Sequence, residues 1–467
     1  MFNKKCESII LTKMNTLQQA QNAWLALAPM RRQRARLKAF TYGRQWGDSC
    51  RSSDGRILSE EQRMVEEGRL PVTNNIIRRM IKAVIGRYRH MCARSPDTSF
   101  VRNEPAVSET DARALEEFLI SGRAVQRLNP DSPVNVSPDS FFYTPFFRSD
   151  ASDCRLMGML HDMSLADVIN RFGTDNPRQV STLKQMLKRG ASQAAPWPVA
   201  AISEFATPAV PGTYRIIELW SLSSCEYLDV TDPVAARSFT DSIDALPRLE
   251  GLNKARAEIG SDPLIVKHRV CERWINSWLT PAGEIINSRI CPEGSLPPFA
   301  ICFYPLIDGE VHSLVEDVID QQKYINRLIS LLDHIISSSA KGVLLYPADQ
   351  LPEGFSWKDI RRIWANPNGI LPFKRTAKSM VPQQVTSSGA AGNEATRMLQ
   401  LQLSLFDEIS GATGALTGKS SSAQGEGMLK TELENALISM LDILSSFRAF
   451  IIRRDRTLKK YAKCNTP

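Results

Sequence analysis

The sequence has few histidines and no closely spaced cysteines. Its five histidines are scattered, and its nine cysteines form no Cys-x-x-Cys pair. Zinc and redox sites need such ligands at short, regular spacing. The pattern therefore predicts no metal site. We also expect no cofactor and no catalytic residues. An odd number of scattered cysteines also favours reduced, mostly buried thiols in a cytosolic-type compartment.

Long apolar runs are also missing. The N-terminal stretch MFNKKCESIILTKMN has only a three-residue apolar run before Thr12, too short for a signal peptide. The most apolar late segment, ALISMLDILSSFRAFII, is interrupted by Asp442 and Arg448. We therefore expect a soluble protein with no membrane contact.

What the sequence does contain is enough apolar material for a large core. It has 467 residues, 43% of them hydrophobic, which excludes a disordered chain and suits two or three domains or one long one. The net charge of +8 permits contact with nucleic acid without indicating it.

Periodicity predicts a mixed α+β fold. A helix should run over residues 15–40, with Arg31, Arg32, Arg34, Arg36 and Lys38 as a solvated basic face rather than a nucleic-acid contact. A second helix should follow Asn75, with an apolar face and a basic one. A Ser N-cap at 164 and a stop at Gly173 bound a third.

The middle of the chain reads as antiparallel sheet. YRIIELWSL, LIVKHRVCERWINSWLT and EIINSRICPEGSLPPFAICFYPL are rich in β-branched and aromatic residues, with turn residues between them. Two stretches, 191–212 and 238–260, read as mobile insertions between elements.

The strongest helical pattern covers residues 310–341. It contains no proline and no internal glycine, and Lys323 and Arg327 fall outside its apolar stripe. So long a rod needs neighbours, which predicts burial between subunits as well as within one. The stripe consists of Val315, Ile319, Ile325, Ile329, Leu332 and Ile336.

A compact module is expected after this helix. It should hold a short strand, a Pro-Glu-Gly turn, a short helix over WKDIRRIW and a second strand over GILPFK. A return helix capped by Asn393 should then run to Ile409, and a final helix from about Met428 to Lys460, ending in the basic tail RRDRTLKK.

The loop SGATGALTGKSSSAQGEG joins these last two helices and invites comparison with a nucleotide-binding loop. That motif needs a glycine five residues before the Gly-Lys pair, and Thr413 stands there. The motif also needs a feeding strand, whereas the preceding residues favour helix. We interpret the loop as a flexible connector.

Several strings, in their joint order, resemble the portal proteins of tailed bacteriophages, particularly the large portals of short-tailed phages. They are FTYGRQW with GRLPVTNNIIRRMIKAVIGRYR, SPDSFFYTPFFRSDASDCRLMGMLHDMSLADVINRFG, and YPLIDGEVHSLVEDVIDQQKYINRLIS. The resemblance covers most of the chain.

The resemblance implies a portal-like protomer that is mixed α+β and predominantly α. It implies an α/β wing over 1–309, a stem helix over 310–341, a small α/β clip over 342–385 and a return stem helix over 386–412. A tunnel loop over 413–426 and a C-terminal helix over 427–467, leading toward a truncated crown, complete it. The clip would present Trp357, Lys358, Arg361, Arg362 and Trp364.

The same resemblance implies the function. Twelve copies would form a ring at one capsid vertex, the channel for genome packaging and ejection. Partners would be double-stranded DNA, the terminase large subunit, major capsid and scaffolding proteins, and a tail adaptor. The protein would reside in the virion, and in the host cytoplasm during assembly. The DNA-facing loop residues would be Gly414, Gly418, Lys419, Ser420, Ser421 and Ser422.

Two other functions stay open at this point. One is a P-loop-like ATPase using residues 411–422, with Lys419 on phosphate. The other is a basic DNA-binding regulator using the helix Ile76 to His90, although nothing in the sequence resembles a helix-turn-helix. Mass in solution separates the three, because a portal must form a large ring.

Overall fold

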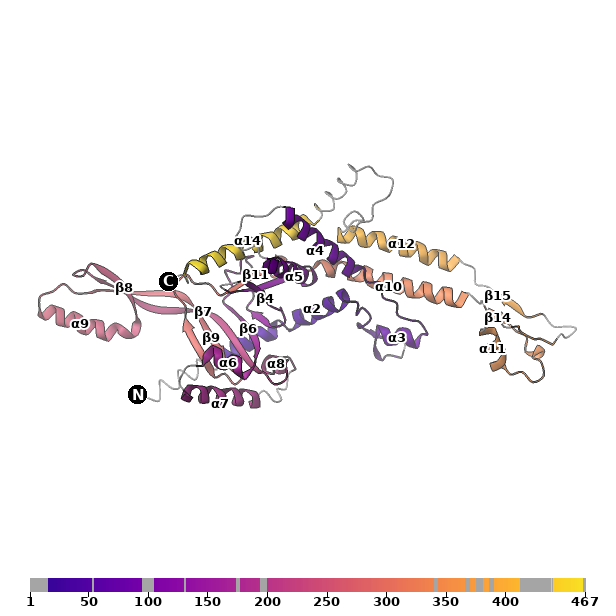
Figure 1. Cartoon of the computed structure of the whole chain (residues 1–467), viewed down its shortest axis with the longest axis horizontal. Helices are drawn as coiled ribbons and strands as arrows, with labels where there is room; N and C mark the ends of the chain where they lie inside the picture. Colours follow the sequence, from indigo (N-terminus) through magenta and orange to yellow (C-terminus); the bar gives the residue numbers. More distant parts are fainter. Residues whose placement is uncertain are drawn as a thin grey trace. The chain divides into compact units, whose positions relative to one another are not determined.

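The computed structural model describes most of the chain, and Figure 1 labels its elements. Helices make up about 50% of the residues and strands about 24%, which confirms a mixed fold with more helix than strand. Two compact units divide the chain: unit 1 (Met1–Lys38, Ile85–Leu314, Ile438–Pro467) and unit 2 (Ala39–Val84, Val315–Leu437). The described residues are 16–52, 54–94, 105–129, 132–173, 177–193, 200–339, 343–365, 370–374, 381–385, 390–411, 438 and 440–464.

Unit 1 is built on an antiparallel sheet of six strands, which confirms the expected β region. Its strand order is β10 (Ile285–Ile290), β9 (Ile265–Leu279), β7 (Tyr214–Asp232), β6 (Leu156–Met163) and β5 (Phe141–Tyr143), with β8 (Arg237–Ser242) pairing onto β7. The long strands β7 and β9 pair from Ile217 opposite Leu279 to Thr231 opposite Ile265.

Alternation along β7 assigns its residues to two faces. Ile217 and Leu219 pack with Trp24 and with Phe205 of α8 (Ala200–Ala206) on one face. Ile216 packs on the other face, against α6 (Leu165–Phe172) and α7 (Pro177–Gln193). Both faces of the sheet are therefore covered, at least in part, by helices.

Helix α6 begins and ends where the sequence predicts. The Ser164 side chain accepts a hydrogen bond from the Asp167 backbone N–H, and the Asp167 carboxylate accepts one from the Ser164 backbone N–H. This reciprocal cap satisfies two N–H groups that a helix start leaves unpaired. Gly173 follows the last turn, as expected.

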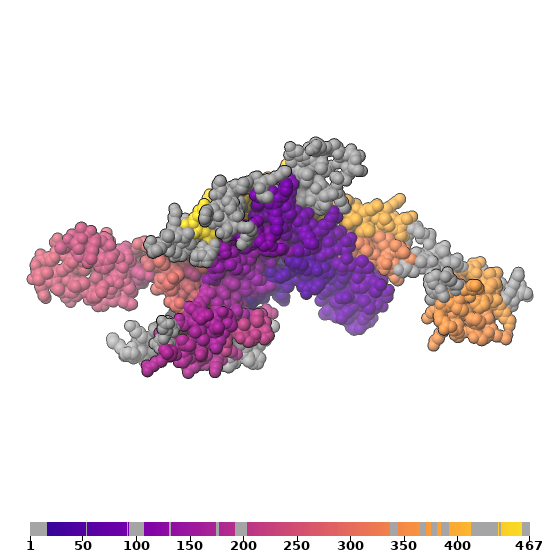
Figure 2. Space-filling view, in the orientation of Figure 1, coloured from indigo at the N-terminus to yellow at the C-terminus, as the bar shows by residue number. Residues whose placement is uncertain are grey.

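The expectation of a mobile insertion over 238–260 is wrong. This stretch contains most of β8, a short 3-10 turn (Ile243–Ala245) and α9 (Leu246–Glu258), and it forms a small lobe with the ends of β7 and β9 (Figure 2). Leu249 of α9 is 1% exposed and packs with Leu228, Val230 and Leu264. Four apolar side chains give the lobe a core of its own. In the other stretch, α7 extends to Gln193 and α8 is ordered, while residues 194–199 lie outside the described ranges.

A second layer of unit 1 combines a small sheet with two helices. Its strands run in the order β11 (Phe299–Phe303), β3 (Arg123–Leu128) and β4 (Pro133–Asn135). Phe118 of α5 (Pro105–Ser121) and Phe447 of α14 (Leu441–Cys464) lie with ring centroids 5.5 Å apart. A two-stranded ribbon, β12 (Pro305–Ile307) with β13 (Glu310–Val311), completes the unit.

In the final helix the apolar pattern predicts that Leu441 faces inward, but Leu441 is 59% exposed and Ile443 is buried instead. The basic tail is not exposed throughout, because Arg454 is fully buried. It donates to both carboxylate oxygens of Asp111 on α5, to Gln126 on β3 and to the adjacent Asp455.

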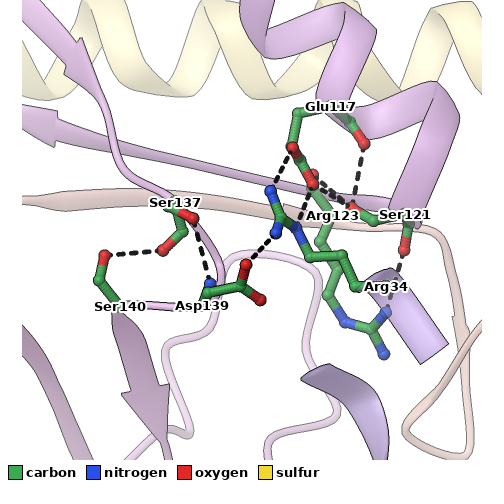
Figure 3. A network of polar contacts seen from close by, with 7 residues as sticks. All are labelled: Arg34, Glu117, Ser121, Arg123, Ser137, Asp139 and Ser140. Atoms are coloured by element: carbon green, nitrogen blue, oxygen red, sulfur yellow. Dashed lines mark hydrogen bonds and ion pairs between the residues drawn. The ribbon is translucent and has the colours of Figure 1, made fainter. Parts of the chain in front are cut away.

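The solvated basic face predicted for Arg31 to Lys38 is also wrong in part. These residues lie in α2 (Ala28–Thr41), where Arg31 and Arg34 are buried. Arg34 donates two 2.7 Å hydrogen bonds to Glu117 and a further bond to Asp139 (Figure 3). Glu117 also accepts from Ser121. The acidic partners come from distant segments, so the basic run by itself gave no sign of them.

Unit 2 contains two long helices, α10 and α12. Helix α10 (Leu314–Ser339) begins at Leu314 rather than Glu310, because Glu310–Val311 pair with β12. Helix α12 (Ala390–Ser410) runs alongside it (Figure 1), and Gly392 lies against Ile335. Asn393 is therefore inside α12 and is not its N-cap.

The smaller elements of unit 2 are a ribbon, a short helix and a compact module. The ribbon pairs β1 (Ser49–Arg51) with β2 (Ile57–Ser59) and leads into α3 (Glu60–Glu66), and α4 (Ile76–Arg94) starts in this unit. The module consists of β14 (Val343–Leu345), a 3-10 turn (Ala348–Gln350), α11 (Trp357–Ala365) and β15 (Gln383–Val385). Its second strand is QQV rather than GILPFK, because the backbone of Gln383–Val385 is what pairs with β14.

Candidate functional site

A row of polar side chains on α10 binds the backbone of an extended segment of unit 2. Gln322, Asn326 and Ser330, which we call the polar seam, are each no more than 1% exposed. Ser330 accepts from the Val72 backbone N–H, Asn326 from that of Asn74 and Gln322 from that of Ile76, each at 3.0 Å. Gln322 also donates to the Asn74 carbonyl at 2.7 Å.

The spacing of the seam follows from elementary geometry. Four helical residues advance about 6.0 Å, and two extended residues advance about 6.6 Å. Every fourth side chain of α10 therefore meets every second N–H of the segment. The two chains run in opposite directions, since Val72 meets Ser330 and Ile76 meets Gln322. The arrangement satisfies backbone donors that have no helix or sheet partner.

Two further amides extend this network. Asn326 donates to Gln45 at 2.5 Å, and Gln45 donates to the Phe40 carbonyl at 2.8 Å. Asn75 donates to the Thr41 carbonyl at 2.9 Å and accepts from the Arg78 N–H at the start of α4. These hydrogen bonds fix the turn before α4 on both sides and connect it to α10.

Lys323 and Arg327 lie beside the seam and are ion-paired. Lys323 contacts Asp48 at 2.7 Å and Glu60 at 2.9 Å, and its side chain is 15% exposed. Arg327 contacts the same Glu60 at 2.7 Å. Arg327 is exposed, whereas Lys323 is partly buried beside its two carboxylate partners.

The apolar stripe predicted on α10 is buried only in its first half. Val315, Ile319 and Ile325 are at most 4% exposed, Ile329 and Leu332 are half-buried, and Ile336 is 65% exposed. Sequence reasoning missed the seam, because it searched for apolar periodicity. A polar residue at every fourth position, Gln322, Asn326 and Ser330, was the signal that could have found it.

In the module after α10, the predicted surface residues are mostly exposed. Trp357 is 49% exposed and packs edge-on against Tyr346, with ring centroids 5.9 Å apart. Lys358, Arg361 and Arg362 are exposed, and Trp364 is half-buried. Ser356 caps α11 through Asp359, and Ile360 is its buried anchor. The helix therefore presents a basic face with an aromatic residue at its start.

The predicted loop residues cannot be placed. Gly414, Gly418, Lys419, Ser420, Ser421 and Ser422 lie outside the described residues, since α12 ends at Ser410 and the description resumes at 438. Within the described ranges, no cluster of three or more His, Cys, Asp or Glu side chains could bind a metal. The described helices include none with the length and apolarity of a membrane span.

Comparison with known proteins gives one family. The model of the phage P22-like portal protein family matches residues 126–449, more than half of the chain. The match includes the whole large sheet of unit 1 and all of α10, α11 and α12. No curated protein matches the chain.

Proposed function

The chain belongs to the phage P22-like portal protein family, and from that premise we propose that its copies form a ring at one capsid vertex. The ring is the channel through which the genome is packaged and ejected, and the docking site for terminase and the tail. The family is a structural one and not a family of enzymes. The protein acts in the virion, after assembly in the host cytoplasm with capsid and scaffolding proteins.

We assign the parts of the protomer accordingly. The α10 and α12 pair is the stem, the β14–α11–β15 module is the clip that meets terminase and later the tail adaptor, and residues 1–309 are the wing. Residues 413–426 are the tunnel loop that faces double-stranded DNA. Lys419, repeated around a ring of twelve copies, would contact phosphates without reading sequence.

The observation that carries the ring proposal is the apolar surface of α12. Leu401 is 49% exposed, Leu403 37% and Ile409 44%, although the same helix already buries Phe406 and Ala395. A helix with apolar residues outside its own packed face has surface to bury against a neighbour. In a closed ring each copy presents two different patches, one to each neighbour, and Leu401 and Leu403 lie on nearly opposite sides of α12.

The test compares two substitutions on adjacent positions of α12. Leu401→Asp places a carboxylate on the proposed interface, and Gln400→Asp places it on a neighbouring exposed position. We expect Leu401→Asp to reduce the ring to smaller species that are still folded, and Gln400→Asp to leave the ring intact. Light scattering after gel filtration, with negative-stain microscopy, measures both. A Leu401→Asp ring of wild-type mass, or a wild-type chain that stays monomeric when concentrated, would contradict the assignment.

A further inference from the structure

Unit 1 contains a cleft on one face of its large sheet, with a volume of about 950 Å³. Its floor is two rows of side chains that cross β7, β9 and β10. Strand pairing sets Glu218, Trp278 and Asn287 in one row, and Trp220, Asn276 and Arg289 in the next. Paired residues point to the same face, so all six belong to one surface. Arg171 of α6, Arg127 of β3 and the loop after β10 line its sides.

The acceptors of the cleft are already used. Glu218 is fully buried and accepts hydrogen bonds from Arg127, from Trp220 at 2.9 Å and from His161 at 2.8 Å. Burial acts to raise the pKa of Glu218, but the hydrogen bonds and charges of His161 and Arg127 lower it to about 2, so Glu218 stays ionised. Glu293 at the rim pairs with Arg269 and Arg273.

The donors of the cleft are not used to the same extent. The guanidinium of Arg171 lies 4.3 Å from the Trp278 ring centroid. Among the described residues, neither Arg171 nor Arg289 forms an ion pair. Burial and the neighbouring Arg127 lower the pKa of Arg171. The site therefore has positive charge without a matched anion.

An unsatisfied amide points to the same conclusion. Asn276 is 8% exposed, and its Oδ1 accepts from Trp278 Nε1 at 2.9 Å. Its buried Nδ2 has no hydrogen-bond partner among the described residues. A buried N–H without an acceptor is costly, and such groups in native proteins call for an explanation. A bound acceptor would supply one.

The rim indicates what kind of molecule brings that acceptor. Ile290 is 52% exposed and Leu296 54%, so the mouth is apolar next to the unpaired arginines. In the described sheet, β10 is an edge strand whose outer side pairs with no other strand. A polypeptide combines the three features that this site would bind. It has carboxylates for the guanidiniums, apolar side chains for the rim, and a backbone that can pair with the open edge of β10.

We infer that this cleft binds an acidic, partly apolar peptide segment of a partner protein, with its carboxylates on Arg171 and Arg289 and an acceptor on Asn276 Nδ2. The inference is independent of ring assembly, because every residue involved belongs to unit 1 of a single chain.

The test selects short random peptides, displayed on yeast, for binding to the full chain. We expect the enriched peptides to carry several Asp or Glu residues beside apolar ones. Arg171→Gln and Arg289→Gln should each weaken a selected peptide about tenfold. Arg237→Gln, at an exposed position of β8 outside the cleft, is the matched control and should change nothing.

Asn276→Asp gives a second measurement. It keeps the acceptor for Trp278 but puts a carboxylate where the peptide's acceptor would sit, so binding should be lost while the melting temperature stays close to wild type. The inference is overturned if no acidic peptide is enriched, or if the arginine variants bind as well as the control. It is also overturned if a single-stranded oligonucleotide binds the cleft more tightly than the selected peptide.

Discussion

Replacing Arg454 should destabilise unit 1 more than any substitution of an exposed arginine. Arg454 is 0% exposed, and its partners Asp111, Asp455 and Gln126 are at most 7% exposed. Arg454→Met keeps the length of the side chain but leaves the Asp111 carboxylate buried without a cation. Breaking a buried pair on one side costs about 3–5 kcal/mol. For a unit of this size we expect the melting temperature to fall by about 5–8 °C.

The pH dependence of this loss of stability tests whether the unpaired Asp111 carboxylate causes it. Burial already raises the pKa of Asp111 even with Arg454 present, and removing the cation raises it further. A carboxyl with a raised folded-state pKa binds its proton more tightly in the folded chain, so its stability contribution is lost as pH rises. The penalty of Arg454→Met should therefore grow from acid to neutral pH, and Asp111→Asn in the same chain should recover part of it.

Calorimetry of the full chain at several pH values is the assay. Arg456→Met, at an exposed position two residues away on the same helix, is the control. A melting temperature of Arg454→Met within about a degree of that of the control would refute the reasoning. So would a loss of stability that is the same at every pH, because the charge of Asp111 would then not be its cause.

Two other predictions concern charge. Glu218, whose pKa falls from 4.5 to about 2, contributes about 3 kcal/mol that is present above its unfolded pKa and lost as pH falls toward 2. In Glu218→Gln the free energy of unfolding should fall less than in wild type as pH drops from 4.5 toward 2. If the two proteins lose stability equally over this range, Glu218 makes no such contribution. Lys419→Ala should leave assembly and melting unchanged, because surface changes usually do, but assembled rings should retain less DNA at raised salt. If Lys419→Ala rings retain as much DNA as wild-type rings at both low and high salt, Lys419 does not face DNA.

Local signals predicted local structure well. Ser164 and Gly173 bound α6 because a cap needs only residues within one turn of it. The antiparallel sheet was predicted from its β-branched runs for a similar reason. The face of α10 was predicted only in part, since the polar seam binds a segment that lies about 250 positions earlier in the chain.

The failures share one physical cause, which is distance along the chain. Arg454 and Asp111 are 343 positions apart, and Arg34 and Glu117 are 83 apart. A basic run is read as solvated when its acidic partners lie elsewhere in the sequence. The β14 partner was misplaced for a related reason: short strands such as Gln383–Val385 carry little pattern, and pairing alone defines them. The tunnel-loop residues, beyond the described ranges, stay a prediction.

The two partners in the polar seam, α10 and the extended segment, differ in how well they tolerate substitution. Gln322, Asn326 and Ser330 act through their side chains, so almost any replacement there removes a bond. Val72, Asn74 and Ile76 contribute only main-chain N–H groups to the same three bonds, and nineteen of the twenty amino acids supply an N–H. Proline alone does not. As far as these bonds are concerned, residues 72–76 can change in sequence, whereas the three side chains on α10 cannot. Substitutions in the extended segment therefore need no compensating substitution in α10.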